Sequence, residues 1–291
     1  MDARRLSLMA AALAVGAGAL WWAWGAWTGN LVDRLGAREA SFAGERALMD
    51  GPRAYNREKL ERELVVGRYN AYQLLLYMRR AKAYFPEIER KLAAAKLPDD
   101  LKYLAVAESA LKPDAGSHAG AAGIWQLMPD TAKRYGLRVD DLVDERFDFA
   151  KSTDAALRHL AMLEKRFDGS WALAAAAYNR GENGLERDLA AQPGVATYWD
   201  AWLNDETARY VYRIMAIKYL MQAGPSLFDR WETLGENAGT PADLKVTGPV
   251  EDLAAWSAGR GLSYAQLRAL NPWILGNRLP AGDWTLRTLA P

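Results

Sequence analysis

The sequence has no cysteine, only two histidines and almost no excess of charge of either sign. The absence of cysteine excludes disulfides, thiolate metal sites and thiol nucleophiles, and it removes the thiol to which bacterial lipoproteins attach their lipid. Its 37 basic and 36 acidic residues give no broad positive electrostatic potential that could bind nucleic acid. We therefore do not expect nucleic acid as a partner. We expect His118 in a loop and His159 on a helix surface, and we expect no metal and no cofactor.

The N-terminal segment is the most informative bulk feature. Arg4 and Arg5 precede a stretch from Leu6 to Val32 that has no charged residue, and a membrane-spanning helix needs only ~20 apolar residues. The two arginines favour a cytoplasmic N-terminus with the rest of the chain outside. The alternative is a signal peptide cleaved near Ala17-Gly18-Ala19. Both interpretations predict a periplasmic body, and the first anchors it to the inner membrane.

The rest of the chain is long enough for one sizeable core and a smaller module. Residues 33–57 are polar and contain Gly51-Pro52, which suits a tether or a loosely packed helix. Helical spacing of apolar residues then predicts helices up to residue 228, with a boundary at Phe85-Pro86 and no strand between Leu97 and Phe228. After a glycine-rich linker at residues 235–241, the remaining 50 or so residues predict the order strand, helix, helix, strand.

Glu108 occupies an unusual position in the predicted helix that begins near Leu97. Leucines at positions 97, 101, 104 and 111 share with Glu108 a spacing of three or four residues, which places this carboxylate on the apolar stripe. A carboxylate there is either paired or partly desolvated at the wall of a cleft, and desolvation raises its pKa. A raised pKa is what a general acid needs. The alternative is a glutamate at the edge of the stripe that reaches water.

Two later segments carry side chains suited to sugar binding. Gly123 to Pro129 contains Trp125 and Gln126, and an alanine-rich helix from Ser170 delivers Tyr178 and Asn179 at its end. Aromatic faces pack on pyranose rings, and amides bind hydroxyl and N-acetyl groups. For the second segment, an ordinary helix C-cap at Gly181 is the alternative.

Together these segments resemble the lytic murein transglycosylases with a goose-type-lysozyme-like fold, and most closely the membrane-bound D group. The resemblance covers about Leu64 to Met221. In it, Glu108-Ser109 is similar to the catalytic glutamate-serine pair, Gly123–Pro129 to the G-x-x-Q-hydrophobic-M-P motif, Ala177–Gly181 to the A-Y-N-x-G motif, and Glu206–Val211 to the segment that closes the cleft. Ser117 and Gln126 also follow Glu108 at the family spacing.

The resemblance implies a reaction and a set of site residues. Glu108 would be the single acid/base that cleaves the bond between N-acetylmuramic acid and N-acetylglucosamine in peptidoglycan and leaves a 1,6-anhydromuramoyl end. Hydrolysis by two carboxylates requires a second one ~5–10 Å away, and none lies between Ser117 and Pro129; we expect Asp114 in a loop and Asp130 as a helix N-cap. Ser117, Gln126, Met128, Tyr178, Asn179 and Tyr210 would line the subsites, Ser117 and Tyr178 nearest the chemistry, and Glu206 would hold Tyr178 or Tyr210.

The C-terminal residues resemble a single degenerate LysM-type module, a class that binds glycans containing N-acetylglucosamine. The similar segments are Val250–Ala254, Gly261–Tyr264 and Leu267–Trp273. A purely structural cap is the alternative.

The predicted fold is therefore mainly α, a lysozyme-like catalytic domain with a small α+β module. The predicted parts are an anchor or signal peptide (1–32), a helical linker with N-terminal helices that pack on the catalytic domain (33–95), the catalytic domain (96–235) and the LysM-like module (241–291). Two other functions stay open: a muramidase of the same fold that uses water, and an inactive membrane-tethered protein that binds peptidoglycan. The expected partner is the peptidoglycan glycan strand; protein partners are not predicted.

Overall fold

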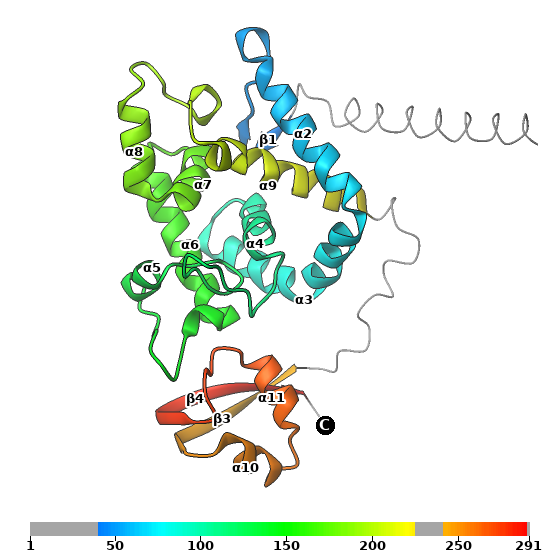
Figure 1. Ribbon diagram of the computed structural model, residues 1–291, viewed down its shortest axis with the longest axis vertical. Coiled ribbons are helices and arrows are strands. Elements are labelled where there is room, and N and C mark those ends of the chain that lie inside the picture. The colour runs from blue at the N-terminus through cyan, green and yellow to red at the C-terminus, as the bar shows by residue number, and fades with distance from the viewer. Residues whose placement is uncertain (1–39, 225–240, 290–291) are drawn as a thin grey trace, which may run out of the picture.

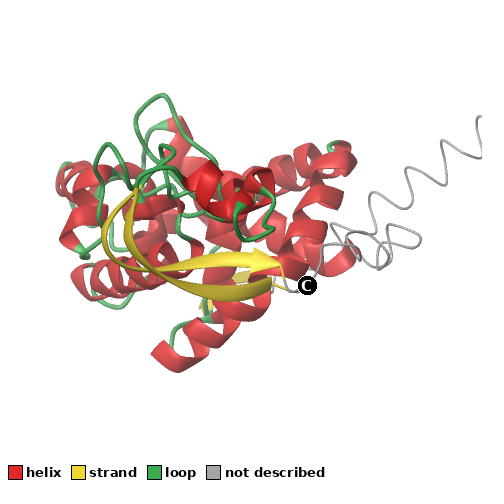
Figure 2. Cartoon of the chain, turned by 90° about the horizontal axis from the view of Figure 1, so that it is seen from below, coloured by secondary structure: helices red, strands yellow, loops and turns green. Residues whose placement is uncertain are grey.

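The structure, a computed structural model, describes residues 40–224 and 241–289 (Figure 1). The predicted anchor or signal peptide lies outside these residues, as does the glycine-rich linker up to residue 240. A helical body is followed by a small module with a two-stranded sheet, seen in yellow across the helices in Figure 2. The prediction of a mainly α fold with an α+β C-terminal module is thus confirmed. Within the described ranges, no helix is both long and apolar enough to cross a bilayer.

The body begins with a short antiparallel hairpin, β1 (Ser41–Phe42) and β2 (Glu45–Arg46). The expectation of a tether or loosely packed helix is wrong from residue 40 onward, because Phe42 and Met49 are buried in the main core. Polar contacts also hold the hairpin: Asp100 Oδ2 accepts hydrogen bonds from Ala43 N (2.8 Å) and from Lys218 Nζ (2.7 Å). Sequence patterns miss such a hairpin because four paired residues are too few to show a period.

Two long helices follow, α2 (Tyr55–Tyr69) and α3 (Ala71–Ala95), separated by a bend at Asn70. The predicted boundary at Phe85-Pro86 is wrong, because α3 continues through Pro86. A proline inside a helix costs about 3 kcal/mol. The buried residues Met78, Ile88 and Leu92 on both sides of it stabilise the continuous helix by burying one apolar face.

The remaining helices surround a short central one. Figure 1 shows α4 (Lys102–Ser109) inside the ring made by the others, and α4 contacts both α3 and α9. Five alanines of α7, Ala172 and Ala174 to Ala177, are buried together with Leu173, and their small side chains let α7 pack against α6 and α9. Asp130 is not the predicted N-cap; Met128 holds that position and Asp130 lies in the first turn. The other bounds are α5 (Pro129–Arg134), α6 (Phe149–Arg166), α7 (Trp171–Arg180), α8 (Glu182–Ala190) and α9 (Asp205–Ala223).

The C-terminal module has the predicted order of strand, helix, helix, strand. Its strands pair antiparallel, with Val246 opposite Trp284, and Trp284 stacks on Trp273 with 5.4 Å between ring centroids. The bounds are β3 (Pro241–Val250), α10 (Leu253–Ala258), α11 (Tyr264–Leu270) and β4 (Leu279–Leu289).

The module is docked on the body through backbone hydrogen bonds. Asp144 N donates to Trp273 O (2.9 Å) and Leu275 N donates to Leu142 O (2.9 Å). Between these bonds, Val143 of the body is fully buried in the hydrophobic cluster of the module. One segment of the body therefore contributes to the core of the module.

Candidate active site

Glu108 lies in the last turn of α4, and the backbone conformation of the next residues ends this helix. Ala110 and Leu111 both adopt left-handed conformations, with φ of 57° and 58°, and Arg80 Nη1 donates a hydrogen bond to Ala110 O (2.9 Å). The helix therefore ends at Ser109, one residue after Glu108. Ser109 is buried, and its Oγ lies 2.8 Å from Ile124 O, which ties α4 to the loop that follows.

The Glu108 carboxyl is half-buried and accepts a hydrogen bond from the Tyr210 hydroxyl of α9. Burial raises its pKa from the ordinary value of 4.5 to about 7. The Tyr210 hydrogen bond and the positive charge of Arg213 oppose this rise, while the negative charge of Glu206 adds to it. With its pKa near 7, the group can both give and take a proton at neutral pH.

The loop at residues 115–128 is held by its own hydrogen bonds, and Gln126 supplies two of them. Gln126 Nε2 donates to Ala115 O (3.1 Å) and to Gly123 O (2.8 Å), and its backbone has a φ of 47°. Gly123 itself has a φ of 78°, and a Cβ atom there would lie 1.9 Å from Arg146 O. The loop thus depends on glycine at position 123, and Gln126 retains Oε1 as the side-chain atom not used in holding it.

Trp125 does not offer a sugar-binding surface, contrary to the expectation from the sequence. It is fully buried, and its Nε1 donates to Thr153 Oγ1 of α6 (2.9 Å). Its backbone oxygen accepts a hydrogen bond from the Tyr178 hydroxyl (2.7 Å). Trp125 therefore fixes the loop on α6 and positions Tyr178.

Tyr178 is packed behind the loop against His159. Their ring centroids are 5.4 Å apart, and His159 Nδ1 lies 3.3 Å from the Tyr135 hydroxyl on its other side. Burial and the charge of Glu108 raise the pKa of the Tyr178 hydroxyl well above its usual value. Tyr178 therefore stays protonated beside the site.

The prediction that His159 lies on a helix surface is wrong, because only 5% of the residue is exposed. Burial lowers its pKa to about 4. Its spacing from Ala156 and Leu163 on α6 places it on the buried face of that helix, a signal that the sequence contains. The predicted loop position of His118 is confirmed.

Asn179 and Glu206 form a separate polar pair at the ends of α7 and α9. Asn179 Nδ2 donates to Glu206 Oε1 (3.0 Å), and Asn179 Oδ1 accepts from Thr207 Oγ1 (2.9 Å). The hydrogen-bond partner of Glu206 is thus Asn179, rather than Tyr178 or Tyr210 as expected. The negative charge of Glu206 still raises the pKa of Glu108.

Ser117 and Met128 lie near the two ends of the loop and are both exposed. Ser117 Oγ accepts a hydrogen bond from Ala121 N (2.9 Å). The structure therefore joins Tyr210 directly to Glu108, brings Tyr178 and Glu206 within electrostatic reach of it, and places Ser117, Gln126 and Met128 together on the loop.

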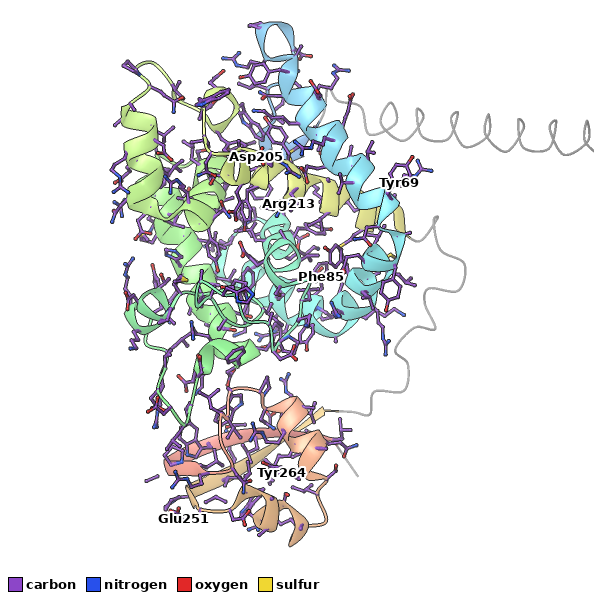
Figure 3. All side chains as sticks on the ribbon, in the orientation of Figure 1. Tyr69, Phe85, Asp205, Arg213, Glu251 and Tyr264 are labelled. Atoms are coloured by element: carbon purple, nitrogen blue, oxygen red, sulfur yellow. The ribbon has the colours of Figure 1, made fainter. Side chains whose placement is uncertain are left out.

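Arg213 was not predicted as a site residue, although it follows Tyr210 by three positions and so shares its helix face. Figure 3 labels it in the middle of the helical body. It lines a pocket of about 320 Å³ that reaches Ala107, the neighbour of Glu108. We call this the Arg213 pocket; its lining residues are Glu63, Val66, Gly67, Asn70, Gln73, Leu74, Tyr77, Ala107, Arg209, Arg213, Ala216, Ile217 and Leu220.

A larger hollow of about 490 Å³ lies between α3 and α6, lined among others by Arg90 and Asp154. None of the predicted site residues lines it, so it is not part of the candidate site. Across residues 40–224 and 241–289, no group of three or more His, Asp or Glu side chains is gathered as metal ligands would be.

The fold and the site define a lysozyme-like helical domain with one titrating carboxyl at the end of its central helix. The family described as the transglycosylase SLT domain matches residues 85–198, and the soluble lytic transglycosylase C-terminal LysM-like domain matches residues 242–283. The chain therefore contains a transglycosylase SLT domain, followed by a LysM-like domain.

Known relatives agree with this assignment. The membrane-bound lytic murein transglycosylase D of Escherichia coli is 34% identical over 205 residues, which are 69% of this chain and 45% of the relative. A peptidoglycan transglycosylase of Escherichia phage T7 is 32% identical over 158 residues, which are 52% of this chain and 11% of the relative. The chain thus spans less than half the length of either.

Among solved structures, the 70 kDa soluble lytic transglycosylase of Escherichia coli is similar at 19% identity. The match covers 69% of this chain and 42% of that one, with a TM-score of 0.43.

Proposed function

We propose that this chain is a peptidoglycan lytic transglycosylase that cleaves the bond between N-acetylmuramic acid and N-acetylglucosamine without water, in remodelling or turnover of the cell wall. The observation that carries the proposal is Glu108, one half-buried carboxyl with a pKa of about 7 at the end of α4. The family assignment and the similarity to murein transglycosylase D support the same reaction.

The reaction needs one group that acts twice. Protonated Glu108 gives its proton to the glycosidic oxygen, and the bond from that oxygen to C1 of the muramoyl residue breaks. The C6 hydroxyl of the same residue then forms the new bond to C1, and its proton passes to the Glu108 carboxylate. The result is a 1,6-anhydro ring, a free N-acetylglucosamine hydroxyl and a reprotonated acid, so that atoms and charge balance.

The surroundings of Glu108 suit this single-acid cycle. The carboxylate that influences its pKa, Glu206, is exposed and hydrogen-bonded to Asn179. We therefore assign Glu206 to organising the cleft rather than to nucleophilic attack. We further propose that the remaining predicted residues line the glycan subsites, with Tyr210 closest to the reacting atoms: Ser117, Gln126, Met128, Tyr178, Asn179 and Tyr210.

The test is mass spectrometry of purified peptidoglycan digested with the protein and with Glu108→Gln. The substitution keeps the shape of the side chain and removes its titrating proton. We expect anhydromuropeptides, lighter by one water than hydrolytic products, from the parent and none from the variant. Reducing muramic acid ends would indicate a muramidase, and equal products from both proteins would remove Glu108 from its role. No product from either would favour a protein that only binds peptidoglycan.

We also propose the predicted division into residues 1–32, 33–95, 96–235 and 241–291. In this division the last part binds glycan, and residues 6–32 anchor the chain to the inner membrane with its body in the periplasm. The match of residues 242–283 to a LysM-like domain supports the glycan-binding role. The charge-free stretch behind Arg4 and Arg5, together with the membrane-bound relative, supports the anchor. Recovery of the protein in the membrane fraction, resistant to high salt, is expected; release into the soluble fraction after cleavage near residue 19 would contradict the anchor.

A further inference from the structure

The Arg213 pocket lies on the α2, α3 and α9 side of Glu108, and the loop at residues 115–128 contributes nothing to it. It is lined by Ala107, the residue before Glu108 on α4, and by Arg213, whose positive charge lowers the pKa of Glu108. None of the subsite residues predicted from the sequence lines it. The pocket therefore offers space close to α4 and the proposed acid that the glycan subsites proposed above do not use.

Arg213 presents a guanidinium group with unused donors to this space. Its charged neighbour is Glu63, at 3.8 Å, which is too long for a hydrogen bond, and the side chain is 38% exposed. Arg209 contrasts with it, because Arg209 donates to Glu63 Oε1 at 2.7 Å and also reaches Asp205. The buried carboxylate of Glu63 is thus satisfied mainly by Arg209, and Arg213 is left able to pair with an added anion.

The rest of the lining is suited to a peptide. Asn70 and Gln73 contribute side-chain amides to the lining, and Val66, which is exposed, contributes apolar surface. A guanidinium binds a carboxylate through two parallel hydrogen bonds. Amides pair with peptide groups, and the apolar surface can accept small methyl-bearing side chains. Arginine, amide and apolar groups converging in one pocket point to a short peptide with a free carboxylate.

We propose that the Arg213 pocket binds the peptide stem of the muramoyl residue beside the scissile bond, and that Arg213 pairs with a carboxylate of that stem. This inference rests on the proposed function, because it takes peptidoglycan as the substrate. Muramic acid bears its stem on a lactyl group, and removal of the stem leaves a lactyl carboxylate. The two sources of a carboxylate are therefore separable by experiment.

The experiment compares the parent protein with Arg213→Gln on two substrates, intact peptidoglycan strands and strands freed of their stems by an amidase. We expect kcat/KM for the intact strands to fall about tenfold, mainly through KM, with little change on stem-free strands. Both substrates use the same Glu108. Any change that the substitution makes in the acid therefore cancels in the ratio of the two kcat/KM values. Arg79→Gln is the matched control, since Arg79 is an exposed arginine of α3 that does not line the pocket.

Equal losses on both substrates would overturn the assignment to the stem and indicate the lactyl carboxylate or an effect on Glu108. No loss on either substrate would also overturn it. Calorimetric binding of a soluble muramoyl peptide to Glu108→Gln, with and without Arg213→Gln, needs no turnover. If the parent yields no anhydro product, the proposed reaction fails, and this measurement alone decides the pocket: binding that depends on Arg213 supports it, and binding that is absent or independent of Arg213 overturns it.

Discussion

The two sides of Glu108 are built by different means. On one side, the loop at residues 115–128 is held by hydrogen bonds to its own backbone. Gln126 donates to two backbone oxygens of the loop, and Tyr178 of α7 donates to a third. On the other side, α9 presents Tyr210 to the carboxyl and Arg213 to an open pocket. The polar groups on the loop side thus stabilise the conformation of the loop. Those on the α9 side act on the protonation of Glu108 or can bind a ligand.

This difference indicates where substitutions should affect stability and where they should affect chemistry. Groups already satisfied within the protein contribute mainly to folding, because removing one leaves its partner unpaired. Groups with spare donors or a shifted pKa contribute mainly to the reaction. The expected effects below test this separation.

The largest effect is expected from Gly123→Ala on the loop side. The new Cβ would lie 1.9 Å from Arg146 O at a φ of 78°, so strain and a clash with the backbone add together. We expect a loss of at least about 3 kcal/mol in the free energy of unfolding. Urea denaturation measures it. Two matched controls separate the causes: Gly120→Ala, with a φ of 90° and open space, should cost about 1 kcal/mol, and Gly116→Ala, with open space alone, almost nothing. Equal costs at the three positions would contradict this account.

Glu108→Gln should stabilise the protein, and only at high pH. The pKa of Glu108 is higher in the folded state, about 7, than its ordinary value of 4.5, so the folded protein binds this proton more tightly than the unfolded chain. The parent therefore loses stability as the pH rises from 4.5 through 7, by about 3 kcal/mol in all. Glutamine has no proton to lose and escapes this penalty. Urea denaturation at pH 4 and pH 8.5 measures the gain, and parallel pH dependences of parent and variant would argue against a desolvated Glu108.

Tyr210→Phe should move the pH dependence of the reaction. The Tyr210 hydroxyl stabilises the Glu108 carboxylate, so its removal raises the pKa of Glu108 further. Activity that requires protonated Glu108 should then persist to higher pH, while kcat falls about tenfold because the carboxyl is less well oriented. Tyr178→Phe is the control from the loop side. It breaks the hydrogen bond to Trp125 O. It should lower activity without moving the alkaline limb of the pH–activity profile.

The smallest effect is expected from Glu206→Gln, with the opposite sign. The negative charge of Glu206 raises the pKa of Glu108, so its removal should displace the alkaline limb to lower pH. Glutamine still offers an oxygen to Asn179, and we expect kcat to change by no more than about threefold. Because Glu206 is exposed, added salt should shrink the displacement. A displacement that is independent of salt would mean that the charge acts from a buried position.

The helical body and the order of elements in the C-terminal module could be predicted because long apolar stripes and glycine-rich breaks are local signals. The hairpin at Ser41–Arg46 could not, since its stability comes from partners such as Asp100 and Lys218 that are distant in sequence. The same holds within the candidate site. Spacing indicated that Glu108 lies on an apolar stripe, but only the fold shows Trp125 buried against Thr153 and Arg213 facing a pocket. Whether a tryptophan faces ligand or core depends on what packs over it, and no local pattern records that.

The burial of Val143 affects how the protein unfolds. Val143 belongs to the body by sequence but to the module by its hydrophobic contacts, and backbone hydrogen bonds of Asp144 and Leu275 cross the border on either side of it. Opening the module would expose this side chain and break both bonds, so each unit stabilises the other. Heating should therefore melt residues 40–224 and 241–289 in one cooperative transition, and calorimetry should record a single peak rather than two.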